Sequence, residues 1–216
     1  MRYIFAFSTM LLLFIFIRPH ADILAIEKKE RDLKELIEEN PFSGQNNIKI
    51  YTANLVLNNG LMVTQKRKKD LLFIDNKVLS ELSKEELKFW VMHEYSHIKD
   101  NDLIKMQMVT ILAYTFVPLC LITISTLLDF PENLFFSLSI VAFFGALYVF
   151  GVLSQFKYKR SKELKCDIYA SAFANKETIR KAFDKFLELN LINKSSSDIF
   201  SSHPSLEKRL ENLKIK

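Results

Sequence analysis

The stretch His93-Glu94-Tyr95-Ser96-His97 decides how this chain of 216 residues is interpreted. Histidines four residues apart lie on one face of an α-helix, about 6 Å apart, so both rings can bind one metal ion. Glu94 follows His93 directly and can reach a water on that ion without binding the ion itself. The spacing is typical of zinc-dependent peptide hydrolysis, with Glu94 as general base; two ordinary helix histidines are the competing interpretation.

A capping box predicts the helix that carries this motif. In Ser83-Lys84-Glu85-Glu86 the Ser83 hydroxyl can accept from the amide three residues later while Glu86 reaches back. A helix therefore begins near Lys84. Its buried faces are formed by apolar residues at helical spacing, namely Leu87, Trp90, Val91 and Ile98.

Three apolar runs indicate that much of the chain lies in a membrane. Residues 3–17 form a short run, whereas residues 108–128 and 134–153 are each long enough to span about 30 Å of bilayer. The polar turn Asp129-Phe130-Pro131-Glu132-Asn133 joins the two long runs, which predicts a transmembrane hairpin. Two buried helices of a soluble protein are the competing interpretation, which length and lack of charge disfavour.

The distribution of charge predicts the orientation in the membrane. The turn carries only acids, whereas cations crowd the end of the second arm, at Lys157, Lys159, Arg160, Lys162 and Lys165. Cytoplasmic loops carry the excess of Lys and Arg, so we expect the catalytic part to face the cytosol. Low glycine with abundant lysine, isoleucine and phenylalanine is typical of an AT-rich bacterial genome, so the expected membrane is a bacterial cytoplasmic membrane.

The first apolar run has two interpretations. It begins after Arg2, and Pro19-His20-Ala21 is a weak cleavage site, as in a secretory signal peptide. Cleavage would place the basic region after the hairpin outside the cell, against the charge rule. An uncleaved anchor over residues 1–20 is therefore favoured.

A small mixed α/β lobe is expected between this anchor and the motif. Residues 23–39 show apolar positions at helical spacing and predict an amphipathic helix that ends at Asn40-Pro41. Residues 48–57 and 61–65 flank Asn58-Asn59-Gly60, a strong signal for a β-hairpin, and residues 71–74 predict a third strand.

The metal centre needs a third protein ligand, because a catalytic zinc is held by three residues and keeps one open position. Residues 160–171 have helical character, and on such a helix Glu163 and Asp167 share a face, with Arg160 one turn before Glu163. Glu163 as ligand, with Asp167 accepting from a ligating histidine, is chemically sound. An ordinary surface pair of acids is the competing interpretation.

Four features in this order resemble the HtpX-type membrane zinc metalloproteases, a family that also includes the CAAX prenyl endopeptidases. They are His93-Glu94-Tyr95-Ser96-His97, the apolar hairpin, Arg160 with Glu163 and Asp167, and Ser202-His203-Pro204 followed by Arg209. The resemblance implies a gluzincin site in which His93, His97 and Glu163 bind zinc and Glu94 polarises water.

The resemblance also implies roles for residues near the C-terminus. His203 and Arg209 would approach the site and help to bind substrate or to stabilise the oxyanion. Alternatively, His203 is a loop residue before a final helix that Ser202 or Ser205 caps.

The cysteines depart from the family pattern and form no framework. Cys166 stands where a small residue, usually alanine, precedes the aspartate, and one turn from Glu163 its sulfur could lie near the metal. A small-for-small replacement is favoured over a fourth ligand, because a closed site would lose the water position. A disulfide with Cys120 is not expected, which fits a reducing compartment.

Together these observations predict a mainly α, α+β zincin-like core with a small β-sheet, interrupted by a transmembrane helical hairpin. The expected parts are an anchor (1–20), a zincin lobe (21–102), the hairpin (103–156) and a helical part with the third ligand (157–216). The expected activity is that of a membrane-bound zinc metalloendopeptidase with one Zn²⁺, acting on membrane-associated proteins in quality control. A dedicated maturation protease and a non-catalytic zinc-stabilised scaffold stay open.

The net charge of +5 does not point to nucleic acid. Its most compact cluster, Lys66-Arg67-Lys68-Lys69, could touch anionic lipid headgroups, but an exposed loop without a partner is favoured. The expected partners are therefore a protein or peptide substrate and the lipid bilayer.

Overall fold

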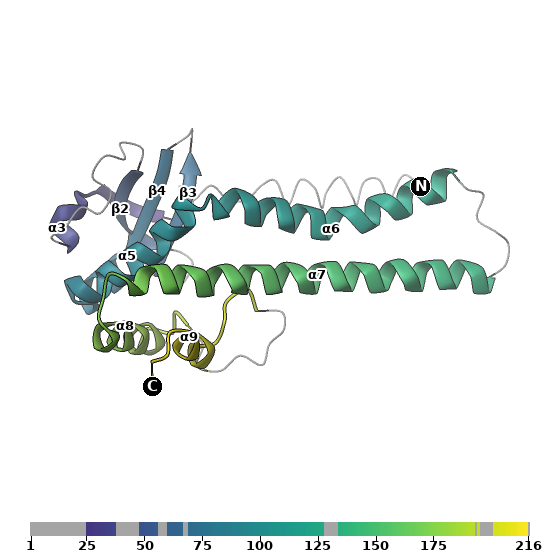
Figure 1. Cartoon of the computed structure of the whole chain (residues 1–216). Coiled ribbons are helices and arrows are strands. Elements are labelled where there is room, and N and C mark those ends of the chain that lie inside the picture. The colour runs from purple at the N-terminus through teal and green to yellow at the C-terminus, as the bar shows by residue number, and fades with distance from the viewer. Residues whose placement is uncertain are drawn as a thin grey trace. The chain divides into compact units, whose positions relative to one another are not determined.

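The computed structural model describes residues 25–37, 48–55, 60–66, 69–127, 134–192, 194 and 201–215 (Figure 1). Among them, residues 104–159 form one compact unit, and the residues before 104 and after 159 form another. The expected N-terminal anchor and the expected turn at residues 129–133 lie outside the described residues.

A four-stranded sheet belongs to the second unit. Its strands are β1 (Ala25–Glu30), β2 (Ile48–Leu55), β3 (Leu61–Lys66) and β4 (Lys69–Asp75), in the order β1-β2-β4-β3. The central pair β2/β4 is parallel, whereas β1/β2 and β3/β4 are antiparallel. Among the described strands, β1 and β3 are therefore the two edges.

The predicted hairpin between residues 48–57 and 61–65 is wrong, because β2 and β3 are not neighbours in the sheet. Strand β4 lies between them and pairs with both. Its apolar run from Leu71 to Ile74 is buried without alternation, which suits a strand covered on both faces rather than one at an edge. Burial of the apolar run of β4 therefore decides the strand order, and the local turn signal at Asn58-Asn59-Gly60 does not.

The amphipathic helix predicted for residues 23–39 is also wrong. Residues 25–30 form strand β1, and among the described residues of this range the helix α3 covers only Leu33–Ile37. Ala25 is buried while the rest of β1 is exposed, as expected for an edge strand. Pairing with β2 decides the structure here, and Lys49 Nζ reaches Glu30 Oε1 across the two strands at 2.8 Å.

The motif helix is α5 (Lys84–Lys99), and its predicted start is confirmed. The Glu86 amide donates to Ser83 Oγ at 3.3 Å, and the Ser83 amide donates to Glu86 Oε2 at 2.9 Å. Before it lies the short helix α4 (Asn76–Glu81), which Asp75 caps. The short helix α4 therefore connects the central strand β4 to the motif helix α5.

Helices α8 (Lys176–Glu188) and α9 (Leu206–Asn212) complete this unit. Aromatic rings join α5 to α8: the Trp90 and Phe186 rings stack with centroids 3.8 Å apart, and Phe183 meets Trp90 edge-on at 5.2 Å. The Trp90 indole also donates to the Ala182 carbonyl at 3.4 Å. This packing immobilises the buried face of the helix that carries the histidines.

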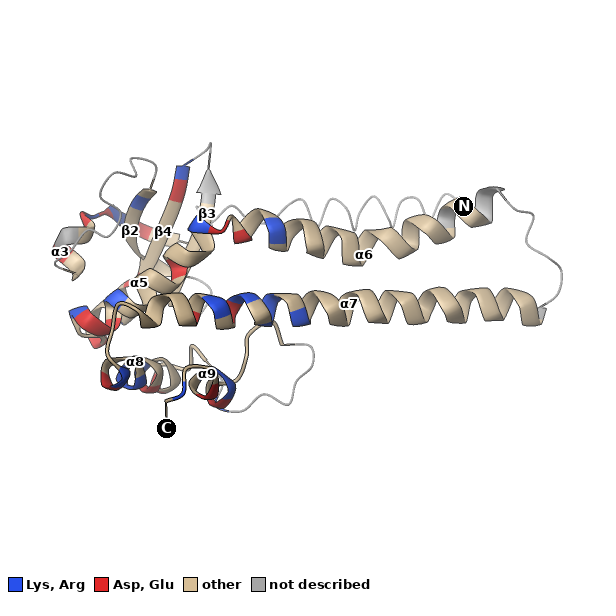
Figure 2. Cartoon of the chain, in the orientation of Figure 1, with Lys and Arg blue, Asp and Glu red and all other residues tan. Residues whose placement is uncertain are grey.

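Two long helices, α6 (Asp102–Leu127) and α7 (Leu134–Ser171), confirm that both long apolar runs are helical. Each is long and apolar enough to cross a membrane, and almost none of the apolar window of either helix is buried within the protein. Figure 2 shows that the charged residues of α7 gather in its C-terminal part. These are the features of helices whose surroundings are lipid.

Candidate metal centre

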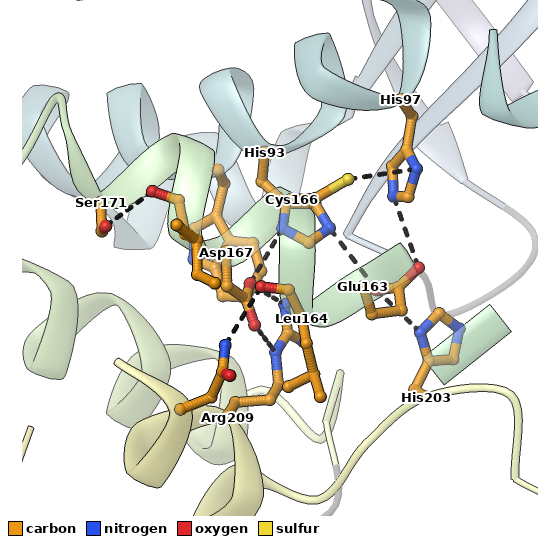
Figure 3. A network of polar contacts seen from close by, with 12 residues as sticks. His93, His97, Glu163, Leu164, Cys166, Asp167, Ser171, His203 and Arg209 are labelled. Carbon is orange, nitrogen blue, oxygen red and sulfur yellow. Dashed lines mark hydrogen bonds and ion pairs between the residues drawn. The ribbon is translucent and has the colours of Figure 1, made fainter. Parts of the chain in front are cut away.

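Two helices bring three metal-ligand side chains together (Figure 3). Helix α5 supplies His93 and His97, and helix α7 supplies Glu163. Glu163 Oε2 lies 3.5 Å from His93 Nε2, and Glu163 Oε1 lies 3.4 Å from His97 Nε2. All three side chains are buried, so the carboxylate faces both rings within the protein.

These separations fit a metal ion better than direct hydrogen bonds. Charge-assisted hydrogen bonds between nitrogen and oxygen are shorter, about 2.7–2.9 Å. Atoms bound to one tetrahedral zinc at about 2.0–2.1 Å lie about 3.3–3.5 Å from one another. The three ligand atoms all lie within 4.8 Å of one another. Two imidazoles and one carboxylate are moreover a ligand set of catalytic zinc sites, with one position left open.

His93 is oriented by a buried ion pair. Its Nδ1 lies 2.9 Å from Asp167 Oδ1, and Arg209 donates from Nε to Asp167 Oδ2 at 2.8 Å. The Arg209 guanidinium lies over the Trp90 and Phe183 rings, 5.1 Å and 4.9 Å from their centroids. Only 2% of Arg209 is exposed, so the structure places it behind Asp167 and away from solvent.

His97 has a corresponding partner that the sequence analysis missed. Its Nδ1 lies 3.3 Å from Oδ2 of Asp102, a fully buried residue, and Lys162 Nζ lies 2.7 Å from Asp102 Oδ1. Asn101, at φ 53°, ends α5 and turns the chain so that Asp102 begins α6 beside the histidine. The sequence did contain a signal for this partner, namely an aspartate just past the end of the motif helix.

The surrounding acids change the protonation of both histidines. Burial opposes the charged form of His93, but hydrogen bonds to Asp167 and Glu163 outweigh it and raise its pKa to about 9. Burial also opposes the charged form of His97, but contacts with Asp102, Cys166 and Glu163 raise its pKa. The site without metal is thus electronegative and attracts protons, or a cation in their place.

The candidate base and the His-Pro segment lie at the exposed side of the centre. Glu94 is partly exposed although its neighbours on α5 are buried. His203, 66% of whose side chain is exposed, has its Nδ1 3.2 Å from Glu163 Oε2. Arg160 donates to the Ser201 carbonyl at 2.8 Å and so fixes the segment that carries His203.

The alternative role for this segment is realised as well. Ser205 caps α9 by accepting from the Lys208 amide at 3.3 Å. The approach of His203 to Glu163 and the cap therefore coexist. The structure thus brings all of the expected site residues into one region: His93, Glu94, His97, Arg160, Glu163, Asp167, His203 and Arg209.

The comparisons with known proteins agree on one family. Residues 27–215 match the family model described as peptidase family M48. The protein named Protease HtpX from Haemophilus influenzae (strain PittEE) is 25% identical over 169 residues, covering 67% of this chain and 58% of its own length. Protease HtpX from Buchnera aphidicola subsp. Schizaphis graminum is 28% identical over 200 residues, covering 78% of this chain and 66% of its own length.

The fold is shared with a solved structure. The crystal structure of S. mikatae Ste24p superposes with a TM-score of 0.63 at 20% identity, covering 97% of this chain and 56% of that one. The chain therefore spans between half and two thirds of the length of the proteins that it resembles.

Proposed function

The chain belongs to peptidase family M48, and on this basis we propose that it is a membrane-bound zinc metalloendopeptidase. The observation that carries the proposal is the convergence of His93, His97 and Glu163 at separations that fit one zinc ion. The partly exposed Glu94 beside them supports hydrolysis rather than a structural site, because a structural site needs no base.

In this proposal each residue has a defined role. His93, His97 and Glu163 hold the ion, which when bound would polarise the scissile carbonyl and acidify the attacking water. Glu94 takes the proton of that water and delivers it to the leaving amine. His203 is exposed next to Glu163 and donates to the developing oxyanion or to the substrate.

Strand β3 is the candidate for binding substrate. It is an edge of the sheet and lies against α5, which carries the motif. An edge strand presents unpaired backbone groups, with which an extended peptide can form hydrogen bonds. We therefore propose that a substrate peptide adds to the sheet at β3, with its scissile bond next to Glu94.

The two apolar helices support a site of action at a membrane. We propose that the protein resides in a bacterial cytoplasmic membrane, that its catalytic part faces the cytosol, and that its substrates are membrane-associated proteins under quality control. Segments of such substrates near the lipid would reach the protease at a high local concentration. A soluble peptide cleaved as efficiently as a membrane-embedded one would contradict this choice of substrate.

The experiment that tests the activity compares wild type, Glu94→Gln and Glu85→Gln in detergent, with a membrane-protein reporter as substrate and with bound zinc quantified. Glu85 is exposed in the first turn of the same helix and serves as the matched control. We expect Glu94→Gln to lose about 10²–10⁴-fold of the rate while its zinc content stays that of wild type. Bound zinc without cleavage in any of the three proteins would overturn the proposal.

A further inference from the structure

A second group of potential ligands shares His97 with the candidate centre. Cys166 Sγ lies 3.4 Å from His97 Nδ1, and Asp102 Oδ2 lies 3.3 Å from the same nitrogen. The ligand atoms of these three buried residues lie within 4.8 Å of one another. Glu163 instead faces Nε2 of the ring, so both nitrogens of His97 have metal-ligand partners.

The proton on His97 Nδ1 cannot serve both neighbours of that nitrogen. Nδ1 of a neutral imidazole carries at most one proton, which it can donate to the Asp102 carboxylate or to the Cys166 sulfur but not fully to both. The spacing suits an ion instead, because nitrogen, oxygen and sulfur ligands of one tetrahedral zinc lie about 3.3–3.6 Å apart. The two distances from Nδ1, 3.3 Å to Asp102 Oδ2 and 3.4 Å to Cys166 Sγ, fall at these separations.

We propose that His97 Nδ1, Asp102 Oδ2 and Cys166 Sγ form a second, inhibitory site for a thiophilic divalent cation such as Zn²⁺. A thiolate, an imidazole and a carboxylate are all zinc ligands, and the thiolate selects against Mg²⁺ and Ca²⁺. Binding releases two protons to solvent, one from the thiol and one from Nδ1. His97 then bridges the two ions as an imidazolate, and Lys162 stays paired with Asp102 Oδ1.

Occupation of this site changes the centre beside it. The second ion replaces the hydrogen bond by which Asp102 orients His97, and its positive charge repels the first ion. Both effects weaken the hold of His97 on the first ion, so excess zinc slows hydrolysis. This consequence rests on the proposed function, whereas binding of the second ion does not.

The test titrates the metal-free full chain in detergent with Co²⁺, which accepts zinc ligands and shows a near-ultraviolet charge-transfer absorption when a thiolate binds it. The variants are Cys166→Ala, Cys166→Ser and His93→Ala, with Cys120→Ala in α6 as the matched cysteine control. We expect wild type and Cys120→Ala to bind two equivalents of Co²⁺ and to show the thiolate absorption. Both Cys166 variants should bind one equivalent of Co²⁺ and lack the thiolate absorption. His93→Ala should also bind one equivalent of Co²⁺ but keep the thiolate absorption.

Three results would overturn the second site: a single equivalent in wild type, two equivalents in both Cys166 variants, or loss of the thiolate absorption in His93→Ala. The last would make Cys166 a ligand of the first centre. In the peptidase assay, the zinc concentration for half-inhibition is expected to rise about tenfold in Cys166→Ala and to stay that of wild type in Cys120→Ala. A wild type that binds two Co²⁺ with the absorption but never cleaves peptides would contradict the proposed function and leave the second site standing.

Discussion

At the scale of single residues, the two histidines of the centre are held with different rigidity. Asp167, which orients His93, is clamped by two nitrogens of Arg209, and the guanidinium is itself packed over aromatic rings. Asp102, which orients His97, has Lys162 as its cation, and the ammonium group sits at the end of a flexible chain. His97 is thus the more adaptable of the two ligands.

Replacement of Asp102 by asparagine tests its part in the centre. Asp102→Asn keeps the shape but removes the charge that orients His97 and makes the ring more basic. We expect zinc affinity to fall about 10–100-fold, because partners of ligating histidines have effects of that size. Competition with a chromophoric chelator measures the affinity, and Glu85→Gln serves as the exposed control. A zinc affinity equal to that of wild type would show that Asp102 does not contribute to the metal centre.

The raised pKa of His93 predicts how the metal-free protein responds to pH. Its pKa is about 9 in the folded chain and 6.5 ordinarily, so its protonated form stabilises the fold fully below pH 6.5. That contribution is lost as pH rises through about 9, and the melting temperature of the metal-free protein should fall over this window.

Thermal unfolding in detergent, with chelator or with saturating zinc, measures this effect. The zinc-loaded protein should show a smaller decrease, because its ligating histidines are neutral throughout. In His93→Gln the side chain at position 93 cannot be protonated. The melting temperature of the metal-free variant should therefore depend less on pH over this window. A slope that is the same with and without chelator would show that protonation of the histidines does not stabilise the fold.

The sequence alone predicted some of these residues, for physical reasons that differ between them. Glu163 and Asp167 could be found because they lie four residues apart on one helix, where the spacing fixes their common face. Asp102 was missed because the left-handed Asn101 brings it beside His97, and a helical projection does not contain that turn. The burial of Arg209 also depends on packing between distant segments.

At the scale of elements, the sheet shows where local signals stop being sufficient. The cap of α5 was predictable, since a capping box is complete within four residues. The pairing of β2 with β4 was not, because it is parallel and joins segments that the intervening strand β3 separates in sequence. The resulting order leaves β3 at the edge next to the motif helix, where an incoming peptide can pair with it.

Backbone-methylated peptides test pairing at β3. A substrate strand alternates between residues whose amides face its partner strand and residues whose amides face away. N-methylation of one residue set should therefore reduce kcat/KM about 2–10-fold per lost hydrogen bond, whereas N-methylation of the other set should have little effect. Equal rates for both sets of peptides in the purified protein would exclude substrate binding by strand addition at this edge.

At the scale of the whole molecule, the described residues divide into two units of opposite character. The unit of residues 104–159 consists of apolar parts of α6 and α7, whose described side chains are largely exposed. The other unit has its own buried core and holds the candidate centre. Exposed apolar helices are stable only where lipid or protein surrounds them, which supports a membrane environment for the first unit.

The positive-inside rule then predicts which side of that membrane carries the centre. The segment of residues 129–133, where the sequence predicts a turn, contains two acids and no cation, whereas five cations lie from Lys157 to Lys165. In a background without cysteines, a membrane-impermeant maleimide should label Asn133→Cys in intact cells. It should label Lys208→Cys, on the exposed face of α9, only after permeabilisation. The reverse pattern would place the centre outside the cytosol, and the substrates would then be periplasmic or extracellular segments rather than cytosolic ones.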